Sequence, residues 1–338
     1  IKILNQSKYK IIFIYKYINI FDVLKIQFYF LNFLKINFAC KNSYFKNYLK
    51  YYFRENLIDS NTYLSFINFF SIKNLYKSRF KINKMIVWYE NQPMEKGLVY
   101  ALNKFYPNCS IKGYKSYFVD NNFHFYIRPT NYEYSNNYIP KLILTVSYHD
   151  QKDLNKYCND IKILAGPSLR FNYLQKIKTI TKPNNYKILV SLPIHLDESI
   201  NILKLINKFN KLNNKYSFFV KPHPFLNFED ISNYIVDPNI QLTGISNEEL
   251  FNKCFSIISN TSSIILEAFL AGMDIVVSTY KRKNIQNPLY FLDDSYYLEI
   301  NDPQKLQIHY ENFTPISEEN ILKEKTKIND FTKNKFLL

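Results

Sequence analysis

The stretch FSIISNTSSIILEAFLAG at residues 255–272, followed by MDIVVS at 273–278, decides the fold of this 338-residue chain. Residues 255–259 are an apolar run of strand length, and apolar residues at helical spacing follow them until Gly272 ends the helix. The second apolar run predicts another strand. A strand, a helix and a strand in this order predict a right-handed βαβ unit, with the start of the helix at the carboxyl edge of a parallel sheet.

Hydroxyl side chains gather at the predicted start of this helix. Asn260 and Thr261 are turn and cap residues, and Ser262 and Ser263 follow them. Hydroxyls of this kind, together with the first-turn amides of a helix, form a binding site for a phosphate. Glu267 lies one turn further along the same helix face, where its carboxylate can accept hydrogen bonds from sugar hydroxyls. The alternative is that the hydroxyls only cap the helix.

A second element lies upstream, at YSFFVKPHP, residues 216–224. It predicts a buried strand that ends at two prolines, because proline cannot continue a hydrogen-bond ladder. His223 is therefore held between Pro222 and Pro224, in a loop at the same carboxyl edge of the sheet. A single histidine is most often structural. The position of this imidazole, fixed between two prolines and beside Lys221, favours a role as hydrogen-bond donor to a phosphate.

The composition is that of a globular protein with room for two α/β domains. Hydrophobic residues make up 47% of the chain and charged residues 21%, which excludes a disordered protein. The net charge of +16 favours anionic partners such as nucleotide phosphates, an acidic glycan or an anionic membrane. A bias of the sequence toward lysine would give the same charge.

The four cysteines are far apart in the sequence. Cys40, Cys109, Cys158 and Cys254 form neither a CxxC motif nor a metal-binding pattern with histidine. A reduced, cytosolic protein is therefore the default interpretation.

Residues 1–80 are predicted to be mainly helical and irregular. Charged residues interrupt the apolar segment 11–38, so it lacks the run of about 20 apolar residues that a membrane-spanning helix needs. An amphipathic helix is the better interpretation. It either packs on the body of the protein or lies on a membrane surface through its aromatic and lysine side chains.

The first half of the chain offers a candidate catalytic base. MIVWY at 85–89 predicts a buried strand, and Pro93 suits the first turn of a helix that continues over 94–105. Glu90 therefore lies at the carboxyl end of a strand. It either caps the helix or faces a cleft as a catalytic base. The polar residues that follow it, Asn91 and Gln92, favour the role of catalytic base.

Strands and helices alternate through both halves of the chain. A linker near residues 180–186 separates the predicted domains 1–183 and 184–338. The fold class predicted is α/β, with two Rossmann-like domains facing a cleft and a helical N-terminal segment. Further strands are predicted at 110–114, 141–147 and 160–165 in the first half and at 187–194, 216–220 and 240–243 in the second.

These motifs resemble those of a known enzyme family, the GT-B glycosyltransferases of bacterial surface polysaccharide (capsule and O-antigen) synthesis. KPHP at 221–224 is similar to the HP motif of the group that uses CMP-sugars, which includes sialyltransferases and Kdo transferases. NTSS at 260–263, with Glu267 and Ala268, is similar to the serine motif of that group. The resemblance covers roughly residues 85–310 and also includes ENQP at 90–93, Gly113-Tyr114 and Gly166-Pro167.

The resemblance implies a metal-independent glycosyltransferase. Such an enzyme transfers an ulosonic acid, for example Kdo or sialic acid, from a CMP-sugar to a hydroxyl of a bacterial surface glycan, and it needs no cofactor besides the donor. Many members carry an acidic pair before a glycine as the base, and this sequence does not. The catalytic residues implied are Glu90 and His223, and the nucleotide-binding residues are Lys221, Pro222, Asn260, Thr261, Ser262, Ser263 and Glu267.

The expected partners are a nucleotide sugar and a glycan or glycolipid acceptor. The expected location is the cytoplasm, with peripheral contact at the inner, anionic face of the cytoplasmic membrane as an open addition. Whether the reaction inverts or retains configuration also stays open. A CDP-glycerol polyol-phosphate transferase is the alternative enzyme. A non-catalytic protein that binds nucleic acid or membrane is a third reading, but the lysines are spread along the chain and form no nucleic-acid-binding module.

Overall fold

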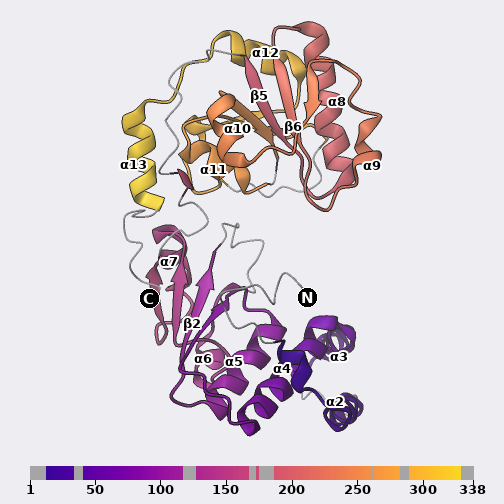
Figure 1. Cartoon of the computed structure of the whole chain (residues 1–338), viewed down its shortest axis with the longest axis vertical. Coiled ribbons are helices and arrows are strands. Elements are labelled where there is room, and N and C mark those ends of the chain that lie inside the picture. The colour runs from indigo at the N-terminus through magenta and orange to yellow at the C-terminus, as the bar shows by residue number, and fades with distance from the viewer. Residues whose placement is uncertain are drawn as a thin grey trace. The chain divides into compact units, whose positions relative to one another are not determined.

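The structure is a computed structural model that describes residues 13–33, 41–116, 127–166, 173–174, 186–260, 262–281 and 289–328. It divides into two compact units. Unit 1 comprises Ile1–Lys115, Phe125–Thr145 and Gln151–Leu164, and unit 2 comprises Ser116–His124, Val146–Asp150 and Ala165–Leu338. Figure 1 colours the chain from indigo at its start to yellow at its end. The predicted linker lies outside the described residues except for Tyr186.

A parallel sheet forms the centre of unit 1. Its strand order is β1-β2-β3-β4, and β2 pairs in parallel with both β1 and β3. All four strands were predicted from the sequence, at 85–89, 110–114, 141–147 and 160–165. The strands are β1 (Lys84–Trp88), β2 (Ser110–Lys115), β3 (Leu142–Thr145) and β4 (Lys162–Ala165).

Helices α4 and α5 pack against each other beside this sheet. Their contact is close at Gly97, where a Cβ atom would lie 2.1 Å from the carbonyl oxygen of Ser65. Ile72 and Leu75 of α4 share a buried core with Val99 of α5. The helices in this half of the chain are η1 (Ile14–Tyr17), α2 (Ile20–Phe33), α3 (Ser43–Ile58), α4 (Ser60–Lys77), α5 (Pro93–Phe105), α6 (Asn131–Ser135) and α7 (Tyr148–Leu154).

Unit 2 is built on a larger parallel sheet. In its described residues six strands lie in the order β10-β9-β8-β5-β6-β7, and every neighbouring pair is parallel. Only β10 was not predicted. The strands are β5 (Lys187–Ser191), β6 (Ser217–Lys221), β7 (Ile240–Leu242), β8 (Ser256–Ser259), β9 (Asp274–Ser278) and β10 (Leu298–Ile300).

The helices of unit 2 cover this sheet. A strand had been predicted over 187–194, but β5 ends at Ser191, two residues before Pro193, which cannot donate to a ladder. The helical segments are α8 (Leu196–Leu212), α9 (Phe228–Ser232), α10 (Asn247–Lys253), α11 (Ile264–Leu270), η4 (Asp294–Tyr296), α12 (Pro303–Glu311) and α13 (Glu318–Ile328).

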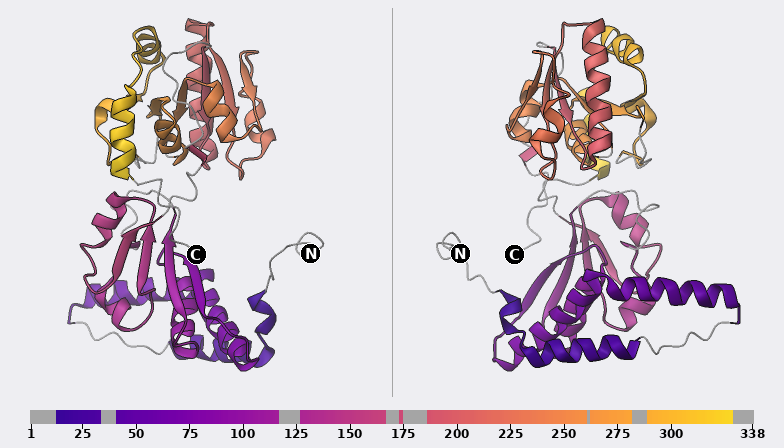
Figure 2. Two further views of the ribbon diagram at one scale, coloured as in Figure 1. Left: turned by 60° about the vertical axis from the view of Figure 1, so that its left-hand side comes forward. Right: turned by 90° about the vertical axis from the view of Figure 1, so that its right-hand side faces the viewer.

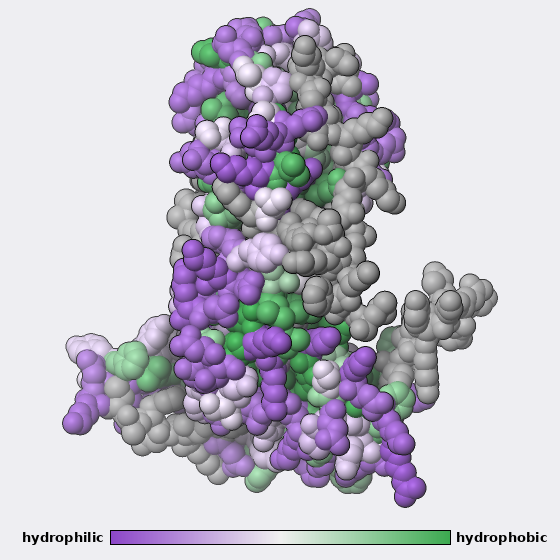
Figure 3. Space-filling view, turned by 90° about the vertical axis from the view of Figure 1, so that its left-hand side faces the viewer, coloured by the Kyte–Doolittle hydropathy of each residue, from purple (hydrophilic) through white to green (hydrophobic). Residues whose placement is uncertain are grey.

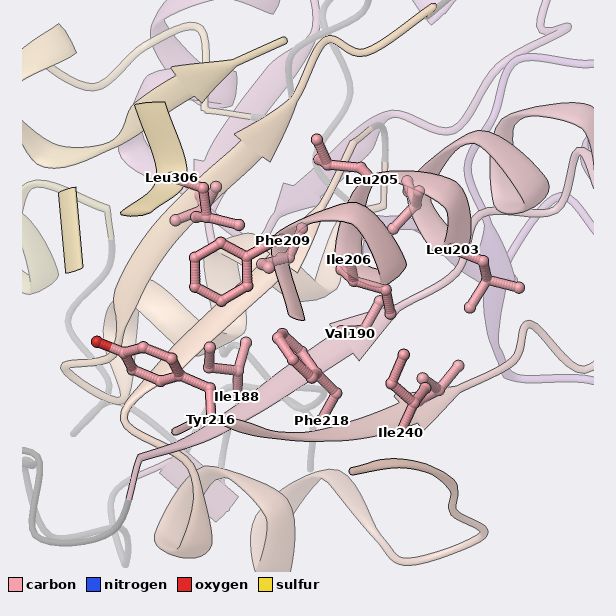
Figure 4. Packing of buried hydrophobic residues seen from close by; sticks show 14 of the residues in the cluster. Ile188, Val190, Leu203, Leu205, Ile206, Phe209, Tyr216, Phe218, Ile240 and Leu306 are labelled. Atoms are coloured by element: carbon pink, nitrogen blue, oxygen red, sulfur yellow. The ribbon is translucent and has the colours of Figure 1, made fainter. Parts of the chain in front are cut away.

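The apolar face of α8 forms the main core of unit 2. Phe209 of α8 contacts Tyr216, just before β6, and Phe218 of β6, with ring centroids 5.5 and 6.0 Å apart (Figure 4). All three side chains are buried. Because each fully buried side chain of this size stabilises a fold by roughly 1.5–3 kcal/mol, this cluster fixes α8 on the strands. The carboxyl ends of β5 and β6 are therefore held in place.

No helix in the described parts of the chain is both long enough and apolar enough to cross a membrane.

Candidate functional site

The sheet of unit 2 brings the two predicted motifs to one edge. Strand β5 pairs in parallel with β6 on one side and with β8 on the other. His223 follows β6 and Asn260 follows β8, so both lie at the carboxyl edge, with only β5 between their strands. Two strand spacings correspond to roughly 9–10 Å. The ends of these strands can therefore face one nucleotide.

His223 is half-buried in the turn after β6. The backbone N–H of Phe225 donates to its Nδ1 at 3.2 Å, so the proton of the neutral ring lies on Nε2. Burial lowers the pKa of His223 below its usual value, which keeps the imidazole neutral near neutral pH. The side chain thus offers a neutral N–H donor.

Lys221 holds the loop beside this histidine. Its ammonium group donates to the carbonyl oxygen of Ile245 at 2.9 Å and to Oδ1 of Asn247 at 2.6 Å. Burial lowers the pKa of Lys221, and the carboxylate of Glu267 partly opposes this effect. Lys221 therefore supports the loop that follows β7. A contact of Lys221 or the adjoining Pro222 with a nucleotide stays a prediction.

A buried pair that the sequence did not reveal fixes the turn after β8. The side-chain amide of Asn260 donates to Oε2 of Glu198 at 2.7 Å. Next to it, the hydroxyl of Ser259 donates to the carbonyl oxygen of Ser191, at the end of β5. Glu198 lies in the first turn of α8. Its separation from Asn260 by 62 positions leaves no local signal for the pairing.

The start of α11 differs from the prediction. The helix begins at Ile264, and the side chain of its N-cap Ser263 makes no capping hydrogen bond. Two first-turn amides, those of Ile265 and Leu266, donate to the preceding serine carbonyls. These two amides are used within the protein, and a contact of Ser262 or Ser263 with a phosphate stays a prediction. Thr261 lies outside the described residues.

Glu267 is buried in α11. The hydroxyl of Tyr173 donates a hydrogen bond to its Oε2, and only 2% of the residue is exposed. A contact between this carboxylate and a sugar hydroxyl stays a prediction.

In unit 1 a residue other than Glu90 closes the turn that begins α5. A catalytic role of Glu90 stays a prediction. Glu90 is half-buried, and its carboxylate accepts hydrogen bonds from Nε1 of Trp88 and Nε2 of Gln92, each at 2.7 Å. The N-terminal turn of α5 is instead closed by Glu95, whose Oε2 accepts the backbone N–H of Glu90 at 2.9 Å. Burial, with a smaller effect of the Glu90 charge, raises the pKa of Glu95 to about 7. This second carboxyl group was not among the residues predicted from the sequence.

An aromatic pocket lies elsewhere in unit 1, between α2, α4 and α5. It has a volume of about 530 Å³, and its lining includes Tyr29, Phe66 and Tyr100. None of the predicted site residues lines it.

Metal ligands are not grouped in the described residues. Among them, no cluster of three or more histidine, cysteine, aspartate or glutamate side chains is placed to hold a metal ion.

Comparisons with known proteins identify the fold. No family model matches the sequence, and no curated protein matches it either. Among solved structures, the UDP-GlcNAc 2-epimerase of Neisseria meningitidis bound to UDP-GlcNAc is 17% identical, with a TM-score of 0.51 over 82% of this chain and 80% of that one. MnaA of S. aureus, solved with UDP, is 13% identical, with a TM-score of 0.52 and the same coverage.

A third structure, from Listeria monocytogenes, is 10% identical, with a TM-score of 0.51 over 81% of this chain and 76% of that one. At these identities the likeness shows the fold. The prediction of two Rossmann-like domains with parallel sheets is confirmed, and the chain has the GT-B fold.

Proposed function

We propose that this protein is a glycosyltransferase whose donor is a nucleotide-activated sugar. The observation that carries the proposal is the arrangement of His223 and the Asn260 turn at the ends of β6 and β8, with β5 between them. Ligands of open α/β sheets bind outside the carboxyl ends of the strands. A neutral imidazole N–H and serine hydroxyls at this edge are suited to a phosphate group.

The proposed donor is a CMP-activated ulosonic acid, and the proposed acceptor is a hydroxyl of a bacterial surface glycan. This choice rests on the HP and serine motifs in the sequence. During transfer the bond between the anomeric carbon and the phosphate oxygen breaks, and its electron pair leaves with CMP. Nε2–H of His223 and the hydroxyls of Ser262 and Ser263 stabilise the charge that develops on the departing phosphate. This role does not require a metal ion.

Glu90 is the proposed base that takes the proton of the acceptor hydroxyl. The hydrogen bonds from Trp88 and Gln92 hold the carboxylate in one orientation. The nearby Glu95, with its raised pKa, is a positioning residue, because it anchors the backbone of Glu90. If the reaction retains configuration, Glu90 acts as the nucleophile instead.

Two other donors are the alternatives to a CMP-sugar. The motif resemblance also extends to CDP-glycerol polyol-phosphate transferases. The fold likeness to a UDP-GlcNAc 2-epimerase solved with UDP-GlcNAc, and to S. aureus MnaA solved with UDP, favours a UDP-sugar as the second candidate. In that case the enzyme would be an epimerase or a UDP-dependent transferase.

A thermal-shift panel of CMP, CDP, UDP and GDP tests the proposal. A ligand present at 100 times its Kd stabilises the folded state by about 2.7 kcal/mol, which is readily measured. We expect the largest shift with CMP, and release of CMP from a CMP-ulosonic acid when a glycan acceptor is added. A shift with UDP alone, followed by epimerisation of UDP-GlcNAc, would replace the transferase by an epimerase. The absence of a shift with every nucleotide would overturn the proposal.

A further inference from the structure

Helix α2 exposes apolar side chains on its outer face. Phe21, Leu24, Phe28 and Leu31 recur at helical spacing, and each is 59–69% exposed. The opposite face of the helix packs against the protein through the buried Ile26. A helix on the surface of a globular protein normally presents polar residues to water. The outer face of α2 therefore has a composition that fits a non-aqueous neighbour.

Helix α3 exposes a row of aromatic rings. Tyr44 is 87% exposed, and Tyr48, Tyr51 and Tyr52 are more than half exposed. The rings of Phe45 and Tyr48 stack with centroids 6.4 Å apart, and those of Tyr48 and Tyr52 with centroids 6.1 Å apart. Rings with an apolar body and a polar tip are enriched where membranes meet water.

Basic residues accompany these rings. Residues 13–33 and 41–55 carry six exposed or half-exposed basic side chains but only one exposed acidic side chain, that of Glu55. The other acidic residue, Asp22, is buried and accepts a hydrogen bond from Asn74 at 2.6 Å. The basic residues are Lys16, Lys25, Lys41, Lys46, Lys50 and Arg54. Their long side chains can place the charge at a headgroup while their methylene groups lie along apolar surface.

Both helices project from the rest of unit 1. The right-hand panel of Figure 2 shows α2 and α3 extending outward, and both pack on α4. In Figure 3 the same projection, at the left of the view, mixes hydrophobic and hydrophilic residues. We refer to the exposed side chains of residues 13–33 and 41–55 as the α2–α3 surface.

We propose that the α2–α3 surface binds the surface of an anionic phospholipid membrane. Apolar and aromatic residues interleaved with lysines are the composition of helices that lie in the interfacial plane of a bilayer. The alternative of a second copy of this chain is disfavoured, because each copy would bring the same excess of positive charge. An acidic nucleic acid would use the lysines but not the apolar stripe of α2.

Sedimentation of the full chain with vesicles tests this proposal. We expect binding to phosphatidylcholine vesicles that contain about one third phosphatidylglycerol, and much weaker binding to phosphatidylcholine alone. Raising the salt concentration from about 0.1 M to about 1 M should weaken binding, because the Debye length falls from about 10 Å to about 3 Å. Equal binding to both kinds of vesicle, or to neither, would overturn the proposal.

Two variants test the two components of the surface. Replacing Phe21, Phe28 and Tyr44 together by serine should weaken vesicle binding by more than about tenfold, since it removes three insertable side chains. Lys25→Gln with Arg54→Gln should weaken it by about 25-fold, at about fivefold for each charge. Circular dichroism checks that each variant folds. If the triple variant does not fold, Tyr44→Ser alone serves, because its side chain is almost fully exposed.

Matched changes in unit 2 provide the control. Val236, Ile308 and Leu322 are 73%, 60% and 62% exposed, close to the values on α2. Their joint replacement by serine should leave vesicle binding unchanged, and an equal loss would refute a specific surface. A dimer in sedimentation equilibrium that the α2–α3 variants abolish, without any vesicle binding, would assign the surface to a second copy. The nucleotide panel is independent of all these outcomes.

Discussion

The side-chain amide of Asn260 donates a hydrogen bond to Oε2 of Glu198 across 2.7 Å, and both residues are almost fully buried. Asn260 begins the turn that carries the serine motif, and Glu198 lies in the first turn of α8, which follows β5. A buried hydrogen bond to a carboxylate is stronger than one between neutral groups. The pair therefore holds the serine turn beside the end of the neighbouring strand.

Breaking this pair should loosen the turn and destabilise unit 2. Glu198→Ala removes the acceptor of a buried amide, so we expect the free energy of unfolding to fall by about 1–3 kcal/mol in urea titrations. Glu198→Gln keeps an acceptor oxygen and should cost less. We also expect weaker nucleotide binding in the alanine variant, measured by thermal shift. A stability loss with unchanged nucleotide affinity would limit the pair to a structural role.

His223 should matter for turnover and not for folding. If its Nε2–H stabilises the departing phosphate, His223→Ala should lower kcat about a hundredfold or more, as the loss of a preorganised donor does, with a smaller change in KM. His309→Ala is the matched control. Its imidazole pairs with Asp274, the first residue of β9, at the other end of the strands, and this variant should keep its activity. Unchanged turnover in the His223 variant would reject the assignment.

Glu95 should make the stability of unit 1 depend on pH. Its pKa is about 7 in the folded protein against 4.5 in the unfolded chain, so the folded state binds the proton more tightly. This contribution to stability is complete below pH 4.5 and is lost as the pH rises through about 7. The wild type should lose on the order of 2–3 kcal/mol over this window relative to Glu95→Gln, measured by urea unfolding at several pH values.

The exposed Glu299 supplies the control for this titration. Glu299→Gln should show the same pH dependence as the wild type. A wild-type curve that runs parallel to that of Glu95→Gln over the whole range would show that burial does not hold the Glu95 carboxyl group in its protonated form.

Gly97 should be intolerant of any side chain. A methyl group there would lie 2.1 Å from the backbone carbonyl oxygen of Ser65, which cannot move without separating α4 from α5. Gly97→Ala should therefore lower the free energy of unfolding by about 1–3 kcal/mol, despite the better helix propensity of alanine. At Gly244 no heavy atom lies within 4 Å of an added Cβ. Gly244→Ala should be neutral or stabilising by up to about 1 kcal/mol, and a comparable loss at both sites would contradict the packing argument.

The sequence by itself determined the secondary structure around the candidate site. The apolar run at 255–259, the turn residues after it and the helical spacing up to Gly272 correspond to β8 and α11. The prolines around His223 likewise placed the end of β6. These features were predictable because they depend on neighbours within a few positions, through side-chain periodicity and the missing N–H of proline.

Only the tertiary structure decided which polar groups are partners. Glu198 meets Asn260 across 62 positions because β5 and β8, the strands that precede them, are neighbours in the sheet. Tyr173 meets Glu267 across 94 positions, a separation that leaves no local signal in the sequence. The position of Glu95, and not Glu90, as the residue that closes the first turn of α5 has a similar cause. Both carboxyl groups lie near the start of α5. Glu95 is buried and accepts the backbone N–H of Glu90, whereas Glu90 is half-exposed. The degree of burial depends on all the residues packed around each side chain.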